Sequence, residues 1–255
     1  MFENKSYELY KGDCLEVMDE LIEQGIKVDM ILCDLPYGTT QNKWDSCIPL
    51  NLLWNRYNQL ISINTPIVLL AQSPFDKHLA ISNINNFKYQ WVIEKTKATG
   101  HLNSKKMPMK AHELALVFYN KLPIYNPQKT TNHPPTHTFT KYTTDGSNYG
   151  ATKIGISGGG NTDRYPRDVL KFKWDTQISS LHPTQKPIKL LEYFINTYTN
   201  EGMTILDNTM GSGSTGVACI NTNRKFIGIE LDDKYFDIAK NRIEDAYNQI
   251  NKIEK

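Results

Sequence analysis

The sequence predicts an α/β protein with a mostly parallel sheet and helices on both faces. Short apolar runs typical of buried strands alternate with segments of helical period along most of the 255-residue chain. Two of these runs end in acidic turns, Asp34-Leu35-Pro36-Tyr37 and Asp207-Asn208-Thr209-Met210-Gly211. Because ligands of such sheets bind beyond the carboxyl ends of the strands, these two turns are the candidate functional segments.

The elements of the first half follow from hydrophobic period and turn residues. Residues 7–13 read as a strand ending in a Gly12-Asp13 turn, and apolar residues at helical spacing predict a helix over 14–24 that ends at Gly25. The same criteria predict the remaining elements of this half. The expected strands are 28–33, 66–70, 88–95 and 113–119, and the expected helices are 48–61 and 75–81.

Regular structure is expected again from residue 165. Pro187 suits the first turn of a helix, and Asp232 or Asp233 suits the cap of the last one. Strands and helices at this spacing indicate parallel pairing with right-handed crossovers. The expected helices are 187–198, 214–220 and one running through Ile243 and beyond, and the expected strands are 203–207 and 226–230.

The segment from about 122 to 160 has a different character. Pro, Asn, Thr and Gly dominate it, and neither a strand period nor a helix period continues through it. It is too long for an idle connection in a compact domain, so it is either a functional lobe or a disordered insertion. We therefore divide the chain into parts at 1–121, 122–163 and 164–255.

Composition excludes several classes of protein. Hydrophobic residues make up 39% and charged residues 22% of the chain, which is ordinary for a globular protein. No apolar run approaches the roughly 20 residues that span a bilayer, and the first five residues lack the apolar stretch of a signal peptide. The 4 cysteines include no C-x-x-C pair, which argues against a disulfide framework or a zinc site. We expect a cytoplasmic protein with no membrane partner and no metal.

Positive charge is concentrated in the middle of the chain. Residues 95–173 hold 13 Lys and Arg against 4 Asp and Glu, a net of +9 in a chain of net +2, so the remainder carries −7. Five of the lysines precede the first acidic residue of this stretch. Such a distribution indicates a surface that faces a polyanion, although a charge run alone is more often a solvated face.

The first acidic turn suits a planar ring that carries an amino group. The Asp34 carboxylate and a turn carbonyl can accept hydrogen bonds from an exocyclic NH2, and Tyr37 can stack on the ring. An ordinary strand-ending turn is the alternative interpretation.

The second acidic turn suits a nucleotide. Its glycines allow close backbone approach, the following helix N-terminus favours an anion, and Glu230 at the end of the next strand can accept hydrogen bonds from ribose hydroxyls. The G-x-G-x-x-G pattern also occurs in NAD-binding proteins and in purely structural turns. Three residues separate Asp207 from the first glycine, which leaves a looser pyrophosphate cradle and disfavours NAD.

Taken together, the motifs resemble those of the β group of amino-group DNA methyltransferases, which act on adenine N6 or cytosine N4. Asp34-Leu35-Pro36-Tyr37 resembles the family's catalytic Asp-Pro-Pro-Tyr, and Asp207 through Gly216 resembles its Asp-x-Phe-x-Gly-Ser-Gly cofactor loop. Ser180 through Pro187 resembles its His-Pro-Thr-x-Lys-Pro segment, and weaker matches lie at 12–13 and 164–167. The resemblance covers nearly the whole chain except 122–160. It implies a Rossmann-like fold with circularly permuted motif order.

The resemblance assigns a role to each part of the chain. Residues 1–121 would carry the target-amine site, 122–163 a target-recognition insertion, and 164–255 the cofactor site. The cofactor would be S-adenosyl-L-methionine, the product S-adenosyl-L-homocysteine, and the partner double-stranded DNA. A homodimer and a cognate restriction endonuclease are left open, and a bacterial or phage-encoded protein is expected.

The resemblance also assigns individual residues. The catalytic residues would be Asp34, Leu35, Pro36 and Tyr37. The cofactor-binding residues would be Asp13, Asp34, Thr184, Gln185, Lys186, Asp207, Asn208, Met210, Gly211, Ser212, Gly213, Glu230 and Leu231. The DNA-binding residues would be Lys95, Lys97, Lys105, Lys106, Lys110, Arg164 and Arg167. Leu35 and Met210 depart from the family's Pro and Phe, and His182 is expected to be structural.

The first residue of the catalytic motif favours adenine N6 as the target, since N4-cytosine enzymes of the family more often carry Ser there. N4-cytosine methylation is the nearest alternative. An idle DNA-binding protein, an NAD-dependent oxidoreductase, and a methyltransferase acting on RNA or protein glutamine are more distant ones. The absence of a Pro-Cys pair argues against methylation of cytosine C5.

Overall fold

The structure is a computed structural model, and it describes residues 5–37, 47–142, 154–172 and 186–253. The chain forms two compact units, one of residues 1–126 with 168–255 and one of Pro127–Arg167. The second unit coincides with most of the segment in which the sequence shows no regular period. The two units are described separately.

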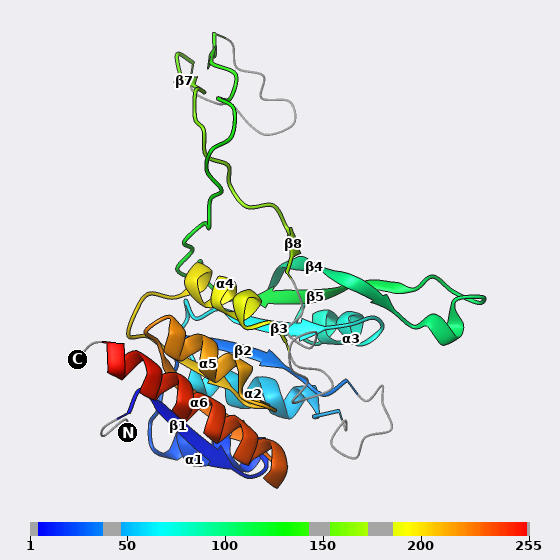
Figure 1. Cartoon of the computed structure of the whole chain (residues 1–255), viewed down its shortest axis with the longest axis vertical. Helices are drawn as coiled ribbons and strands as arrows, with labels where there is room; N and C mark the ends of the chain where they lie inside the picture. Colours follow the sequence, from blue (N-terminus) through cyan, green and yellow to red (C-terminus); the bar gives the residue numbers. More distant parts are fainter. Residues whose placement is uncertain (1–4, 38–46, 143–153, 173–185, 254–255) are drawn as a thin grey trace. The chain divides into compact units, whose positions relative to one another are not determined.

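An eight-stranded sheet forms the centre of the first unit, with strand order β1-β10-β9-β2-β3-β5-β4-β8 (Figure 1). The five strands from β1 to β3 in this order are mutually parallel, β5 is antiparallel to both of its neighbours, and β4 is parallel to β8. The carboxyl ends of β1, β10, β9, β2, β3 and β4 therefore share one edge of the sheet. The strands are β1 (Tyr7–Lys11), β2 (Met30–Asp34), β3 (Ile67–Ala71), β4 (Phe87–Thr99), β5 (Lys110–Phe118), β8 (Val169–Lys171), β9 (Thr204–Asp207) and β10 (Lys225–Glu230).

Helices cover both faces of this sheet, as the sequence predicts. Helices α1 to α3 contribute to one hydrophobic core, and α4 to α6 contribute to another. Alternate residues of β2 divide between the two cores, with Met30 and Leu32 on the α4 side and Ile31 and Cys33 on the other. The helices are α1 (Cys14–Glu23), α2 (Leu50–Leu60), α3 (Phe75–Ser82), α4 (Ile188–Tyr198), α5 (Ser214–Asn221) and α6 (Asp233–Ile253), with a 3₁₀ turn η1 (His101–Asn103).

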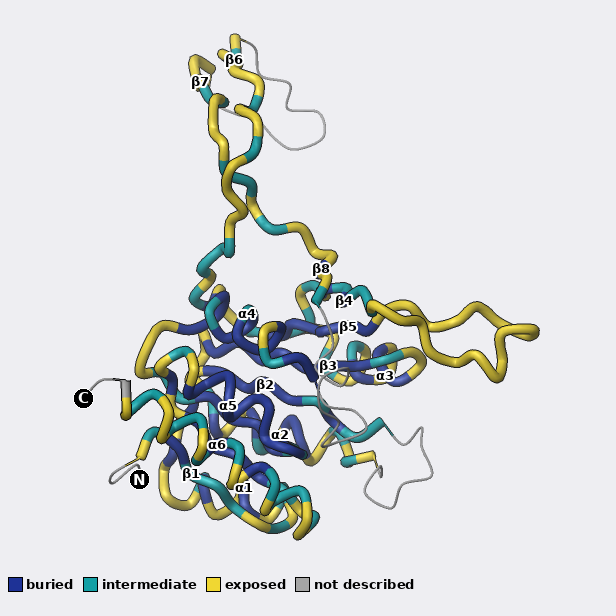
Figure 2. The backbone as a smooth tube through the Cα atoms, viewed as in Figure 1, coloured by how far each residue is buried: buried dark blue, intermediate teal, exposed yellow. Residues whose placement is uncertain are grey.

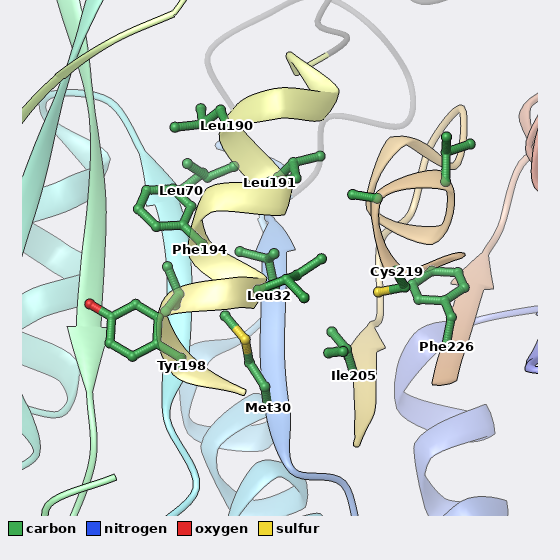
Figure 3. Close-up of a cluster of buried hydrophobic side chains, with 14 of the residues drawn as sticks. Met30, Leu32, Leu70, Leu190, Leu191, Phe194, Tyr198, Ile205, Cys219 and Phe226 are labelled. Carbon is green, nitrogen blue, oxygen red and sulfur yellow. The ribbon is translucent and has the colours of Figure 1, made fainter. Parts of the chain in front are cut away.

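The α4 side of the sheet shows how this packing is built. Leu190, Leu191 and Phe194 of α4 lie in the same buried cluster as Met30 of β2 and Leu70 of β3 (Figure 3). All five side chains are almost fully removed from water. This packing holds the start of α4, and with it Lys186 just before the helix, against the strands that carry the candidate site.

Strands β4 and β5 continue beyond the sheet as a two-stranded hairpin. Every residue from 96 to 112 is exposed, and the hairpin projects from the covered part of the unit (Figure 2). The strands predicted from the sequence end at residue 95 and resume at residue 113, so the prediction misses the last four residues of β4 and the first three of β5. The hairpin starts from the same edge of the sheet as the two acidic turns, because β4 runs parallel to β3.

The second unit is small and has little core. Strands β6 (Phe139–Thr140) and β7 (Ser157–Gly158) pair antiparallel, and a bridge joins Thr130 to Arg164. A side chain at Gly159 would place its Cβ 2.2 Å from the carbonyl oxygen of His137, so this position requires glycine. Backbone pairing and turns, more than buried apolar area, hold this unit together.

Across the described residues, no helix combines the length and apolar character needed to cross a membrane.

Candidate active site

The carboxyl ends of four adjacent parallel strands bring four acidic residues to one edge of the sheet. Asp34 ends β2, Asp207 ends β9 and Glu230 ends β10, while Asp13 follows β1. The amide of Gly12 donates to the Glu230 carbonyl at 3.0 Å, which fixes the Asp13 turn beside β10. The two acidic turns, far apart in sequence, are therefore neighbours in the fold.

Asp34 makes contacts through both carboxylate oxygens. The Lys186 ammonium donates to Oδ2 at 2.5 Å, and the Tyr37 hydroxyl donates to Oδ1. The Thr209 hydroxyl donates to the Asp34 carbonyl at 3.1 Å, so the loop after β9 contacts the turn after β2 directly. The Tyr37 ring lies on the Phe75 ring with centroids 5.3 Å apart. These contacts fix the Asp34 carboxylate and the Tyr37 ring next to each other.

The side chain of Leu35 explains one departure from the family pattern. It is 2% exposed and packs in the core on the α1 to α3 side. Leu35 therefore anchors the turn by burial, and only its backbone is available to a ligand. Pro36 lies between the buried Leu35 and Tyr37 and is partly exposed.

Lys186 and Asp34 belong to a larger set of buried charges, which we call the ionic chain: Asp34, Lys186, Glu113 and Lys95. The Lys186 ammonium lies 3.3 Å from Glu113 Oε2, and the Lys95 ammonium lies 2.6 Å from Glu113 Oε1. Gln72 donates to the same Oε1 at 2.7 Å. Lys186 and Glu113 are 6% and 3% exposed.

The two central members of the ionic chain support each other's charge. Burial alone would raise the pKa of Glu113, but the ammonium groups of Lys186 and Lys95 outweigh it, and the net pKa is lowered. Burial alone would lower the pKa of Lys186, but the carboxylates of Asp34 and Glu113 outweigh it, and the net pKa is raised. Both groups are therefore charged at neutral pH.

Asp207 is almost fully buried beneath the loop after β9. Burial raises its pKa to about 7, against hydrogen bonds from the Thr215 hydroxyl at 2.6 Å and the Thr209 amide at 3.1 Å. These two donors fix the carboxyl group between the loop and the first turn of α5.

Glu230 and Arg242 fasten the glycine loop from two sides. The amides of Gly211 and Asp232 donate to the two carboxylate oxygens of Glu230 at 2.8 and 2.9 Å. Burial raises the pKa of this carboxyl, and the two amides oppose the shift. The Arg242 guanidinium donates to the Ser212 carbonyl at 2.5 Å and to the Ser212 hydroxyl at 3.0 Å. The sequence does not single out Arg242, which lies 30 residues from the loop it holds.

Two glycines of the loop adopt left-handed backbone conformations. Gly211 has φ +51° and Gly213 has φ +78°. A Cβ on Gly213 would lie 2.9 Å from Ala239 of α6, so the loop also needs glycine for space. Met210 is buried, and a Cβ added to Gly228 would lie only 2.4 Å from the Met210 sulfur. Gly228 is a further position that the sequence does not single out.

Asn208 faces inward. Its Oδ1 accepts hydrogen bonds from the Tyr57 hydroxyl at 2.5 Å and the Cys33 thiol at 2.9 Å, both in the core. Its side chain therefore supports the loop from below. The prediction that Asn208 binds the cofactor therefore rests on its backbone.

The remaining predicted cofactor residues are placed differently from one another. Asp13 is exposed and caps α1, since its Oδ1 accepts from the amides of Leu15 at 2.8 Å and Glu16 at 3.3 Å. Leu231 is 62% exposed directly after β10. Thr184 and Gln185 lie outside the described residues, as does His182.

The predicted DNA-binding lysines fall into two groups. Lys97, Lys105, Lys106 and Lys110 are exposed on the β4–β5 hairpin, where Lys110 donates to the Ser73 carbonyl at 3.1 Å. The Lys95 side chain is 8% exposed and is paired with Glu113. Its ammonium is committed to a buried carboxylate, so the prediction that Lys95 contacts phosphate is wrong.

The two predicted arginines lie in the second unit. The Arg164 guanidinium donates to the carbonyls of Asn161 at 2.9 Å, of Asp163 at 2.8 Å and of Pro134. It therefore holds the backbone of its own unit, while Arg167 is exposed.

In the described parts of the chain, no group of three or more His, Cys, Asp or Glu residues is arranged to hold a metal ion.

Comparison with known proteins gives consistent results. A sequence model of the N6_N4_Mtase family, described as DNA methylase, matches residues 28–241. The type II methyltransferase M2.MboI of Moraxella bovis is 24% identical over 278 residues, which cover 99% of this chain and 92% of the relative. The DNA adenine methyltransferase YhdJ of Escherichia coli (strain K12) is 43% identical over 87 residues, which cover 34% of this chain and 28% of the relative. The crystal structure of the M1.HpyAVI-SAM complex has a TM-score of 0.66 at 26% identity and covers 93% of this chain and 98% of that chain.

Proposed function

Because the chain belongs to the N6/N4 family of DNA methylases, we propose that it is a site-specific methyltransferase that transfers a methyl group from S-adenosylmethionine to the N6 amine of adenine in double-stranded DNA. The observation that carries this proposal is the hydrogen bond of 3.1 Å from the Thr209 hydroxyl to the Asp34 carbonyl. It joins a turn suited to an amine to a loop suited to a nucleotide. A reaction between two bound groups needs this proximity.

The residues around the glycine loop fit S-adenosylmethionine, which supplies an activated methyl group when bound. Each carboxylate oxygen of Glu230 accepts one amide and retains a second lone pair for a ribose hydroxyl. The left-handed Gly211 and Gly213 allow the backbone to approach the ligand, and Met210 and Asp207 line the same loop. Asp13, which follows β1 beside β10, is the residue proposed to accept a hydrogen bond from the adenine amine of the cofactor.

The catalytic turn acts mainly by positioning the target amine. Hydrogen bonds from the amine to Asp34 and to the Leu35 or Pro36 carbonyl draw the nitrogen toward tetrahedral geometry and free its lone pair for attack. As the nitrogen forms its bond to the methyl carbon, the bond from that carbon to the sulfonium sulfur would break and S-adenosylhomocysteine would leave. The nitrogen gains positive charge in this step, and the same acceptors stabilise that charge. Tyr37 stacks on the base. The proton that the nitrogen then loses passes to solvent.

The target amine is paired inside a duplex, so the base must leave the stack, at a cost of roughly a few kcal/mol. Contacts between exposed lysines and phosphates offset this cost and make binding salt-dependent. Lys97, Lys105, Lys106 and Lys110 of the hairpin, and Arg167 in the second unit, are the exposed cations proposed for these contacts.

Adenine is favoured over cytosine by Asp34 at the first position of the motif, and the relative named as a DNA adenine methyltransferase supports the same choice. The type II relative from Moraxella bovis supports a role in restriction and modification in a bacterial cytoplasm, alongside a cognate endonuclease.

The test is transfer of tritiated methyl from S-adenosylmethionine to DNA, followed by digestion and identification of the modified nucleoside. Recovery of N6-methyladenine supports the proposal. Recovery of N4-methylcytosine would show that the target is the N4 amine of cytosine and not the N6 amine of adenine. Label in RNA or protein alone, or in nothing, contradicts the proposed function. Nanopore sequencing of DNA from expressing cells would add the recognition sequence.

A further inference from the structure

We propose that Lys186 is a positioning residue for methyl transfer: its buried ammonium, held by Glu113, fixes the orientation of the Asp34 carboxylate. This inference rests on the proposed function, since it concerns the same catalytic carboxylate. The sequence resemblance instead suggests that Lys186 contacts the methionine end of the cofactor or caps the following helix.

The geometry favours the contact with Asp34. The Lys186 ammonium lies 2.5 Å from Asp34 Oδ2 and 3.3 Å from Glu113 Oε2, so it bridges two carboxylates from two different strands. Its side chain is 6% exposed, whereas that of Asp34 is 24% exposed. Lys186 thus lies behind Asp34, on the protein side of the catalytic carboxylate. A bridging ammonium of this kind has little freedom to turn toward a ligand.

The charges of the ionic chain balance. It contains two carboxylates and two ammonium groups in alternating order, and each internal member has a partner of opposite charge on both sides. Removing Lys186 would leave two carboxylates with one cation, Lys95, which pairs with Glu113. Asp34 and Glu113 would then lose the cation that lies between them and holds both in place.

This arrangement has a chemical consequence for Asp34. A carboxylate that an ammonium holds in one orientation keeps its lone pairs directed at the amine. It can therefore stabilise the charge that develops on the nitrogen during the reaction.

The groups that face Asp34 come from every neighbouring element. Lys186 precedes α4, Tyr37 lies in the same turn, and Thr209 follows β9. Asp207 of β9 interacts with Asp34 electrostatically. Among the described residues in direct contact with Asp34, Lys186 is the cation. Its removal should therefore release the Asp34 carboxylate more than any other single change in the ionic chain.

The test is the single-turnover rate of methyl transfer at pH 7, at saturating S-adenosylmethionine and DNA, together with the Kd for S-adenosylmethionine. For Lys186→Met we expect a rate 10- to 100-fold lower, on the order expected for a misplaced acceptor. The Kd should stay within about threefold, and Lys186→Arg should restore part of the rate.

Lys189→Met is the matched control, because Lys189 lies one turn further on in α4 with its side chain 79% exposed. It should behave like the wild type. Two results would overturn the proposal: a single-turnover rate in Lys186→Met equal to that of the wild type with an unchanged Kd, or a Kd for S-adenosylmethionine at least tenfold weaker with a normal rate at saturation. The second result would identify Lys186 as a cofactor ligand.

Two further measurements apply if Lys186→Met does not fold or if the wild type is inactive. If Lys186→Met does not fold, Glu113→Gln removes the other anchor of Lys186, and an unchanged single-turnover rate in that variant would overturn the proposal. If the wild type transfers no methyl group at all, the proposed function fails, but the coupling between Lys186 and Asp34 can still be measured. The effects of Lys186→Gln and Asp34→Asn on the urea midpoint should then be non-additive, and strict additivity would refute the pairing.

Discussion

The amide of Gly211 donates a hydrogen bond of 2.8 Å to the Glu230 carboxylate, which ties the loop after β9 to the end of β10. The second oxygen of Glu230 accepts the amide of Asp232 at 2.9 Å. One side chain thus sets the shape of the glycine loop and offers its remaining lone pairs to a ligand. The cofactor site proposed here is assembled around this carboxylate.

We predict that Glu230→Gln weakens binding of S-adenosylmethionine about 10- to 100-fold, because hydrogen bonds to a charged acceptor contribute about 1.5–3 kcal/mol. Isothermal titration calorimetry measures the affinity. Glu244→Gln is the control, since Glu244 pairs with Lys5 away from the loop, and its affinity should equal that of the wild type. Equal affinities for all three proteins would remove Glu230 from the cofactor site.

A second prediction concerns Asp34→Ala. The methyl-transfer rate should fall about 100- to 1000-fold, which is the usual loss when one preorganised group at a reacting centre is removed. Binding of S-adenosylmethionine should change by less than about threefold, although Asp34 adjoins the cofactor loop. Near-normal turnover by this variant would refute the role of Asp34 as the amine acceptor.

Much of the site could be predicted because it depends on local sequence. Asp34 and Glu230 each follow an apolar run directly, so a strand end with an acid could be read from a few residues. Parallel pairing then brings such ends to one edge of the sheet. The Leu35 substitution also has a physical account, because the structure shows its side chain in the core.

The ionic chain could not be predicted in the same way. Lys186 and Glu113 meet only because α4 packs on the sheet and β5 runs antiparallel beside β3, and neither relationship has a local signal. The burial of Lys95, in contrast, has a local pattern. Trp91 and Ile93 are buried, and a strand period of two places Lys95 on the same face of the sheet. Its partner Glu113 is the first acidic residue of the basic middle of the chain.

The third prediction is a dependence of stability on pH that arises from Asp207. Burial raises its pKa to about 7, whereas an unfolded Asp titrates near 4. Between these pH values the folded state binds the extra proton, so the contribution of Asp207 to the free energy of unfolding falls as pH rises. From pH 5 to pH 8 the loss is on the order of 2–3 kcal/mol.

Asp207→Asn should remove this part of the pH dependence. Urea unfolding at pH 5 and at pH 8 would show a smaller difference for the variant than for the wild type. Asp245→Asn, on the exposed face of α6, should keep the wild-type difference. If the Asp207 variant keeps it as well, the carboxyl does not titrate in this range.

The fourth prediction separates space from backbone conformation at Gly213. Both Gly213 and Gly202 have φ +78°, but a Cβ on Gly213 would meet Ala239 at 2.9 Å, whereas a Cβ on Gly202 would meet nothing within 4 Å. Gly202→Ala should cost about 1–2 kcal/mol from the left-handed backbone alone. Gly213→Ala should cost a further 1–3 kcal/mol or so from crowding against α6, and should weaken cofactor binding. Equal losses in chemical denaturation would show that the loop moves away from α6 without penalty.

The last prediction concerns the hairpin lysines and uses salt as the probe. Each phosphate contact adds about one to the slope of log Kd against log salt concentration. The double variant Lys105→Gln with Lys106→Gln should therefore lower that slope by about two, because both side chains are exposed on an arm that starts at the catalytic edge of the sheet. Fluorescence anisotropy with a labelled duplex measures it. Lys234→Gln with Lys240→Gln removes the same charge from exposed positions on α6 and should leave the slope unchanged. An equal decrease in both double variants would mean that net charge, and not the hairpin, drives binding to DNA.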